Sequence, residues 1–224
     1  MAIDVLGISG SPIRNSNTDR AVNAVLEATG LTTEFHKLSQ LDIAPCKACL
    51  GCVKNNECVV KDDGWVLAEK FRDAKAFVIG AFTPYSSLDA RTKLFMERMY
   101  CFRHQTGLNA GKIGAAVITA AVPPGAEGLP PASETAAAQL KFWMMEEGMT
   151  DLGAMILAGN VPCIRCGHGD DCPVSGVAML FGPDATVESV GVNTFEQSDH
   201  AMSEAQALGR RIREAIEARE PAAV

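Results

Sequence analysis

The feature that most constrains this chain is the regular alternation of short β-rich apolar runs with stretches of helical periodicity. The apolar runs cover residues 3–8, 32–38, 75–80, 112–121 and 152–157, and the helical stretches cover residues 18–29, 62–73, 89–100, 133–147 and 198–219. Strands that alternate with helices form parallel sheets, because each helix carries the chain back across one face of the sheet. The sequence therefore predicts an α/β fold with a doubly wound, parallel five-stranded sheet.

Length and composition fit one domain of this kind. The chain has 224 residues, 47% of them hydrophobic, and no linker divides it, so we expect a single domain over residues 1–224. The net charge of −7 argues against nucleic acid and against an anionic membrane surface as partners. No apolar run approaches the roughly 20 residues of a membrane span. The first residues lack the basic start of a signal peptide and include Asp4, which predicts a cytoplasmic location.

Two long segments interrupt the alternation. A Cys-rich insert covers about residues 45–61, after the second predicted strand, and a largely non-helical excursion covers about residues 160–194, after the fifth. Open α/β sheets bind ligands at the carboxyl ends of their strands. We therefore expect the excursion to lie at the ligand-binding edge and to be part of the same domain.

Cysteine spacing carries the strongest chemical information. Eight cysteines are many for a cytoplasmic chain, where disulfides are rare, and four of them form Cys46-x2-Cys49-x2-Cys52-x5-Cys58. Three thiolates at successive x2 spacing can bind three corners of an iron–sulfur cubane from one compact loop, and a fourth nearby completes the set. Structural zinc usually has two Cys-x2-Cys pairs separated by a longer loop. The motif favours a [4Fe–4S] cluster, with a zinc site and redox-active thiols as the alternatives.

The polar loop at residues 7–18 joins the first strand to a helix that starts near Thr18. A helix N-terminus offers unpaired N–H groups and a partial positive charge, both of which suit a phosphate. The loop has neither Gly-x-Gly-x-x-Gly nor a Walker lysine. It supplies the side-chain donors Ser9, Ser11, Arg14, Ser16, Asn17 and Thr18. The loop predicts a phosphate site, and a serine-rich capping loop without a ligand is the alternative.

These motifs resemble a known family. Gly-x-Ser-Gly-Ser-Pro-x3-Ser-Asn-Thr at residues 7–18, and Ala-Phe-Thr-Pro-Tyr-Ser-Ser-Leu at residues 81–88, resemble the two flavin loops of the NADPH-dependent FMN reductase family of flavodoxin-like proteins. Residues 93–98 match the family's next helix, with Glu97 in place of aspartate. The resemblance implies a flavodoxin-like fold and bound FMN. The FMN contacts that it implies are Ser9, Ser11, Pro12, Arg14, Ser16, Asn17, Thr18, Pro84, Tyr85, Ser86, Ser87 and Leu88.

The cysteine motif resembles the iron–sulfur flavoprotein branch of the same family. That branch has a compact cysteine motif after the second strand, followed by an Asp-Asp pair that opens the second helix, as Asp62 and Asp63 do here. This resemblance implies that FMN and a [4Fe–4S] cluster occur in one protein.

A second cysteine group lies in the excursion, at Cys163-x2-Cys166-x5-Cys172. Three cysteines make an incomplete cluster site. We expect Cys101 to supply the fourth ligand if the end of the third helix approaches the excursion, with His168 or His104 as substitutes. A second iron–sulfur cluster, a zinc site and unligated thiols near the flavin all remain open for this group.

Together the motifs predict an FMN- and [4Fe–4S]-dependent oxidoreductase that holds cluster and flavin near each other and relays electrons between them. NAD(P)H is one reductant to consider, and the acceptor would be a redox protein such as a ferredoxin, or a small molecule. The family resemblance further implies a homodimer or homotetramer. One alternative is an NAD(P)H-dependent reductase of quinones, nitro compounds or FMN with structural metal on the cysteines. The other is a non-catalytic electron-carrier subunit of a larger redox complex. No His–carboxylate pair predicts a catalytic acid or base.

Overall fold

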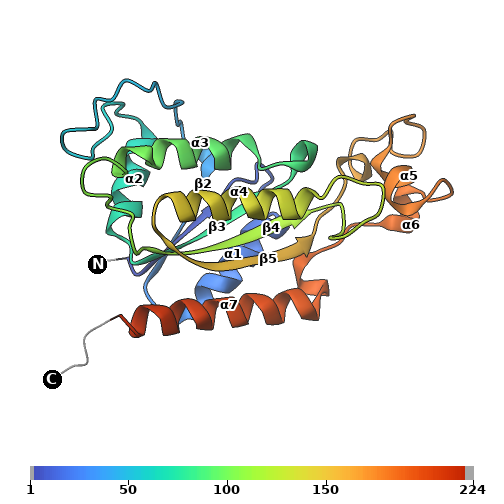
Figure 1. The fold of residues 1–224 in the computed structure, drawn as a ribbon. Helices are drawn as coiled ribbons and strands as arrows, with labels where there is room; N and C mark the ends of the chain where they lie inside the picture. The colour runs from blue at the N-terminus through green and yellow to red at the C-terminus, as the bar shows by residue number, and fades with distance from the viewer. Residues whose placement is uncertain (1–2, 220–224) are drawn as a thin grey trace.

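The computed structural model describes residues 3–219 and contains the predicted sheet. Its strands are β1 (Val5–Ser9), β2 (Thr33–Lys37), β3 (Ala76–Phe82), β4 (Ile113–Ala120) and β5 (Thr150–Ala158). All neighbouring strands are parallel, and their order is β2-β1-β3-β4-β5 (Figure 1). This order is that of flavodoxin-like doubly wound sheets, so the predicted fold class is confirmed.

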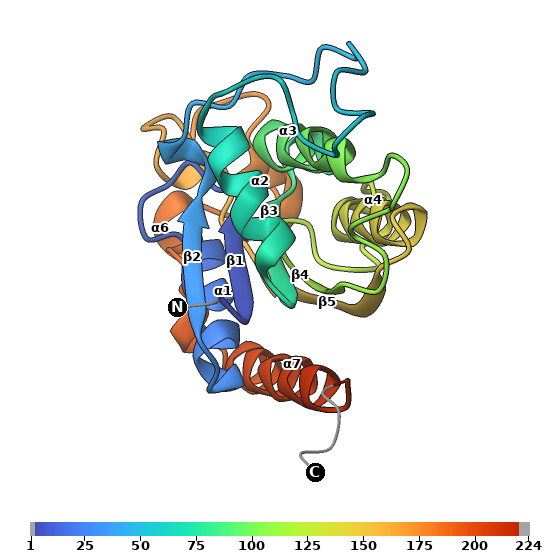
Figure 2. The ribbon, with the colours of Figure 1, turned by 90° about the vertical axis from the view of Figure 1, so that its left-hand side faces the viewer.

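Helices cover both faces of the sheet. On one face lie α1 (Asn17–Thr29) and α7 (Asp199–Glu217); on the other lie α2 (Asp63–Asp73), α3 (Ala90–Arg98) and α4 (Ala132–Glu146), as Figures 1 and 2 show. Two apolar cores fill the space between these layers. Phe71, Phe77 and Phe95 pack in the core under α2–α4, whereas Val25 and Leu208 pack in the core under α1 and α7. Burial on both sides explains why β3 and β4 are continuous apolar runs.

Side chains that cap the helices explain where they begin. Ser16 caps α1 and forms a reciprocal capping box with Asp19, while Asp62 caps α2 and Asp89 caps α3. The predicted third helix is shorter than expected, because its last turn, from Met99, tightens into a 3₁₀-helix through Phe102.

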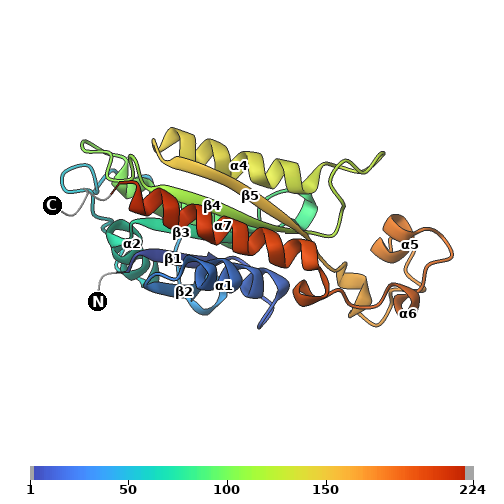
Figure 3. The ribbon, with the colours of Figure 1, turned by 90° about the horizontal axis from the view of Figure 1, so that it is seen from below.

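The two inserted segments lie at opposite ends of the molecule. After β2 the chain runs along the outside of α2 and α3, so that the Cys-rich insert lies beside the carboxyl end of α3. The excursion, with its short helices α5 (Gly176–Phe181) and α6 (Val187–Val190), extends from the other end of the sheet (Figures 1 and 3). Among the helices of residues 3–219, none is both long and apolar enough to cross a membrane.

The close packing of α7 on α1 generates a prediction. A Cβ atom built on Gly209 would lie 2.5 Å from the carbonyl oxygen of Val25, so no side chain fits between the two helices. Replacing a helical glycine by alanine normally stabilises a protein by about 1 kcal/mol. We expect Gly209→Ala instead to lower the free energy of unfolding by about 1–3 kcal/mol, measured by urea denaturation.

Ser203 is exposed on the same helix and provides the matched control. Ser203→Ala changes helix propensity without changing the contact, and it should raise stability by up to about 0.5 kcal/mol. If Gly209→Ala stabilised the protein as much as propensity predicts, the close helix contact would be refuted.

Candidate functional site

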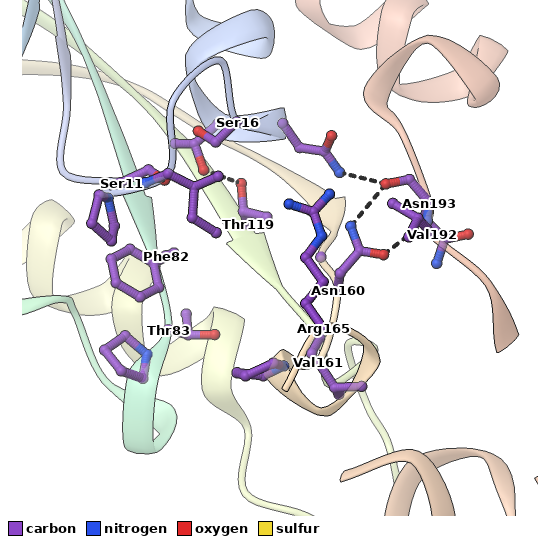
Figure 4. Close-up of a pocket in the computed structure, with 18 of the residues that line it drawn as sticks. Ser11, Ser16, Phe82, Thr83, Thr119, Asn160, Val161, Arg165, Val192 and Asn193 are labelled. Atoms are coloured by element: carbon purple, nitrogen blue, oxygen red, sulfur yellow. Dashed lines mark hydrogen bonds between the residues drawn. The ribbon is translucent and has the colours of Figure 1, made fainter. Parts of the chain in front are cut away.

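A cavity of about 830 Å³ opens at the carboxyl ends of the strands, where doubly wound sheets bind ligands (Figure 4). Four segments line it: the loop after β1, the loop after β3, the end of β4, and the excursion with its return segment at residues 192–194. Eight of the predicted FMN contacts line the cavity, namely Ser11, Pro12, Arg14, Ser16, Asn17, Thr18, Pro84 and Tyr85. The structure therefore brings the two predicted flavin loops together around one space.

A buried ion pair shapes the first loop. The Lys37 ammonium, at the end of β2, lies 2.5 Å from the Asp19 carboxylate in α1, and both side chains are less than 10% exposed. Lys37 also donates to the carbonyl of Ile13 at 2.7 Å. The other Asp19 oxygen accepts from the hydroxyl of Ser9 at 2.6 Å. Ser9 thus lies behind the cavity wall, where it supports the loop that carries Ser11.

The return segment of the excursion is joined to the start of α1. The Asn17 and Asn160 side-chain amides both donate to the carbonyl of Asn193, at 3.0 and 2.8 Å. On the cavity floor the hydroxyls of Thr18 and Thr119 lie 2.8 Å apart. Figure 4 shows these contacts on the wall and floor of the cavity.

The second loop divides into two parts. Pro84 and Tyr85 line the cavity, and Tyr85 is fully exposed with a left-handed φ of 50°, a conformation that costs a non-glycine residue energy. Ser86, also left-handed at φ 58°, Ser87 and Leu88 do not belong to the cavity lining. The side-chain Oε1 of Gln139 in α4 accepts hydrogen bonds from the Ser87 hydroxyl and the Leu88 amide. The first half of the loop is thus presented to a ligand, and the second half anchors it.

The charge of the cavity lining contrasts with that of the whole chain. The chain has a net charge of −7, yet the described residues that line the cavity include Arg14, Arg20 and Arg165 and no acidic residue. Arg165 extends from the excursion into the cavity (Figure 4). The first turn of α1 leaves N–H groups without helical partners next to these cations. The cavity therefore fits a ligand that combines a phosphate with a flat, largely apolar group, as FMN does.

The first cysteine group lies in one tight loop. Its backbone turns through left-handed residues at Ala48, Leu50 and Asn56, and a Cβ on Gly51 would lie 2.6 Å from a methyl group of Val59. Partial burial raises the pKa of the Cys52 thiol, and the nearby thiols of Cys58, Cys46 and Cys49 add to this shift. The four thiols thus belong to one loop, in which those of Cys46 and Cys49 are exposed and those of Cys52 and Cys58 are partly buried.

The donor set of this loop fits an iron–sulfur cluster. Within residues 3–219 no three His, Cys, Asp or Glu side chains converge closely enough to hold a single metal ion. A cubane imposes a different requirement, since its four thiolates bind four different iron atoms. Four thiols in one loop meet the requirement for donors.

Arg98 connects this loop to the core. Its guanidinium is almost fully buried and makes two charged hydrogen bonds to Asp62, at 2.6 and 2.9 Å. It also donates to the carbonyls of Ala44 and Val60, and its Nη2 lies 3.5 Å from the Cys58 sulfur. Burial alone would raise the pKa of the Asp62 carboxyl, but the hydrogen bonds from Arg98 and from the backbone amides of Ala44 and Trp65, together with the Arg98 charge, hold that pKa below its usual value. A single cation thus holds both ends of the cysteine loop.

Comparison with known proteins shows to which family the chain belongs. Residues 3–156 match the family model described as NADPH-dependent FMN reductase, which covers more than half of the chain. The chain belongs to the NADPH-dependent FMN reductase family. It is therefore a flavin-dependent oxidoreductase of that family, and the resemblance inferred from the two flavin loops is confirmed.

Curated relatives of the chain are iron–sulfur flavoproteins of archaea. The iron–sulfur flavoprotein of Methanosarcina thermophila is 32% identical over 116 residues, which cover 50% of this chain and 61% of that relative. One from Methanocaldococcus jannaschii is 26% identical over 216 residues, covering 95% of this chain and 96% of the relative. Among solved structures, a WrbA-like flavodoxin from Agrobacterium tumefaciens matches with a TM-score of 0.54 at 12% identity, covering 98% of this chain and 100% of that one. That structural likeness supports the fold alone.

Cys101 lies beside the first cysteine group. Burial raises the pKa of the Cys101 thiol to about 12, and the neighbouring thiols of Cys58 and Cys52 contribute. Asn56 donates to the carbonyls of both Cys101 and His104, and the His104 ring packs edge-on against Tyr100. The end of α3 therefore does not approach the excursion, as a fourth ligand for the second group would require, because this end of α3 packs against the cysteine loop.

Without Cys101, the second cysteine group consists of Cys163, Cys166 and Cys172, with His168 beside them. The His168 amide donates to the Cys166 sulfur at 3.4 Å, and Cys166 lines the cavity together with Arg165. Cluster and flavin were expected near each other, but within one chain the Cys-rich insert lies at the opposite end from the excursion (Figure 1), whose residues line the cavity. The reason is the path after β2, which leads away from the cavity along α2 and α3.

Several residues of the site were absent from the sequence analysis. Thr119 lies at the carboxyl end of β4 and Asn160 follows that of β5, so the rule that ligands bind at this edge would have found them. No sequence pattern points to Asp19 and Lys37 as residues of the site, because their pairing depends on where β2 ends relative to α1.

The buried pair yields a stability prediction. Removing one partner of a buried ion pair leaves an uncompensated charge and costs about 3–5 kcal/mol. We expect Lys37→Met to lower the free energy of unfolding by that amount, measured by chemical denaturation at neutral pH.

Lys70→Met is the matched control, since Lys70 pairs with Glu34 at a half-exposed site where ion pairs contribute about 1 kcal/mol or less. Equal losses for the two variants would contradict the structural role of the Lys37–Asp19 pair.

Proposed function

We propose that the protein is an FMN-dependent oxidoreductase that also carries a [4Fe–4S] cluster on Cys46, Cys49, Cys52 and Cys58 and transfers electrons through both. The observation that carries the proposal is the cationic cavity, built from both flavin loops of the family, in a chain that also has four thiols in one loop. When bound, FMN would supply a group that takes up two electrons together and releases them singly, and the cluster would carry one at a time.

The chain's own residues would position the flavin. The N–H groups at the start of α1, with Ser11, Ser16 and Thr18, would bind the phosphate, and Arg14 would neutralise its charge. Pro84 and Tyr85 would line the ring. The Lys37–Asp19 pair would act at a distance, because it fixes the loop that presents these donors.

Arg98 would support the cluster. Four thiolates bring negative charge into this loop, where Cys52 and Cys58 are partly buried, and the buried guanidinium beside Cys58 offsets part of that charge. Hydrogen bonds and charges near cluster sulfurs are among the factors that set reduction potential. Arg98 would therefore both hold the loop and favour the reduced cluster.

The distance between the two sites bears on the partners. Because the cysteine loop and the cavity lie at opposite ends of one chain, we propose that electrons pass between them through a second copy or a redox protein, such as a ferredoxin, that faces the loop. NAD(P)H or a small-molecule acceptor would use the open cavity instead.

Composition of the protein purified without oxygen tests this function. We expect about one FMN per chain and about four iron and four sulfide per chain, since one cubane contains that number of each. Cys49→Ser should lose most of the iron and keep the FMN, whereas the same change at Cys172 should keep both. Zinc without sulfide would sink the cluster proposal and favour an NAD(P)H-dependent reductase with structural metal. Absence of bound flavin would sink the proposal as a whole.

Arg98→Lys tests the support of the loop. Lysine keeps the positive charge but cannot form the two-pronged contact with Asp62. We expect this variant to retain less than half of the iron of the unaltered protein after desalting, with FMN unchanged. Arg103→Lys is the control, since Arg103 forms more exposed ion pairs. Full iron retention by Arg98→Lys would show that the two-pronged contact between Arg98 and Asp62 is dispensable.

A further inference from the structure

The second cysteine group lies at the edge of the flavin cavity rather than at a separate metal site. Cys166 and its neighbour Arg165 are part of the cavity lining, and Cys163 lies one turn before them in the 3₁₀-helix Pro162–Ile164. Cys172 is absent from the described lining. Two of the three thiols are therefore within one turn of the space that the flavin would occupy.

Both of these sulfurs accept hydrogen bonds from the backbone. The Gly176 amide donates to the Cys163 sulfur at 3.2 Å, and the His168 amide donates to the Cys166 sulfur at 3.4 Å. These contacts hold both sulfurs in place beside the cavity.

The turn also brings the two cysteines toward each other. The Cys166 thiol donates to the carbonyl of Cys163 at 3.4 Å, so its side chain folds back over the preceding turn. Residues three apart in a helical turn have Cβ atoms about 5–6 Å apart, whereas a disulfide needs about 3.5–4.5 Å, so the turn must tighten by about 1–2 Å for the bond to form. Cys101 packs against the other cysteine loop, so the described cysteines supply no fourth thiol for a cluster here.

We propose that Cys163 and Cys166 form a redox-active dithiol that exchanges two electrons with the flavin, an inference that rests on the proposed function. In the oxidative direction two S–H bonds break and one S–S bond forms, and two electrons and two protons pass to the oxidised flavin. In the other direction reduced flavin returns both, and the disulfide opens. Cys166 faces the cavity, and Cys163 is its disulfide partner. The pair stores one further two-electron equivalent beside the flavin.

A reductive titration of the holoprotein measures this store. With one FMN and one cluster, the unaltered protein should take up about five electrons per chain, since a disulfide and a flavin each accept two and a cubane one. Cys163→Ser and Cys166→Ser should each take up about three, a loss of about two electrons. Cys172→Ser is the matched control and should take up as many electrons per chain as the unaltered protein.

Differential alkylation with mass spectrometry supplies the independent readout. Cys163 and Cys166 should be protected in the oxidised protein and labelled after reduction, while Cys172 is labelled equally in both states. Equal labelling of Cys163 and Cys166 in both states would overturn the proposal. So would about eight iron per chain falling to about four in Cys166→Ser, which would reveal a second cluster. FMN content is measured first: protein without FMN refutes the proposed function, whereas bound FMN with unresponsive thiols refutes the dithiol alone.

Discussion

The buried ion pair between Lys37 and Asp19 is the contact on which the site depends. Lys37 ends β2, and Asp19 belongs to the first turn of α1. Asp19 accepts a hydrogen bond from the Ser9 hydroxyl, and Lys37 donates one to the carbonyl of Ile13. A charge pair in a dry environment holds its partners strongly only when all remaining polar atoms are bonded, as they are here. One interaction thus fixes the loop that presents donors to the cavity.

Arg98 plays the equivalent part at the other end of the molecule. It is buried in α3, and it binds both the segment before the cysteine motif, at Ala44, and the segment after it, at Val60 and Asp62. An exposed loop of cysteines would otherwise have few contacts to order it. Lys37 and Arg98 are both buried cations, but they belong to different ends of the fold and would support different cofactors.

Much of the fold and part of the site could be predicted from the sequence. The five strands, the opening of α2 at the Asp62–Asp63 pair and the two flavin loops follow from local patterns, and the structure contains each of them. Arg165 was not predicted, because it reaches the cavity from a segment far from the flavin loops in sequence. Cys101 was expected with the second cysteine group and lies with the first.

The class of fold and the residues available for chemistry follow from the sequence alone, because hydrophobic period, capping residues and cysteine spacing are local properties of the chain. Which of these residues meet depends on how the elements pack in three dimensions. The path after β2 carries the first cysteine group away from the cavity, and the packing of α3 takes Cys101 with it. The hydrogen bonds that join Asn193 to Asn17 and Asn160 draw the excursion back, and Cys166 comes with it to the cavity edge. The positions of these cysteines relative to the cavity result from long-range packing and buried charge, which cannot be inferred from the spacing of residues along the chain.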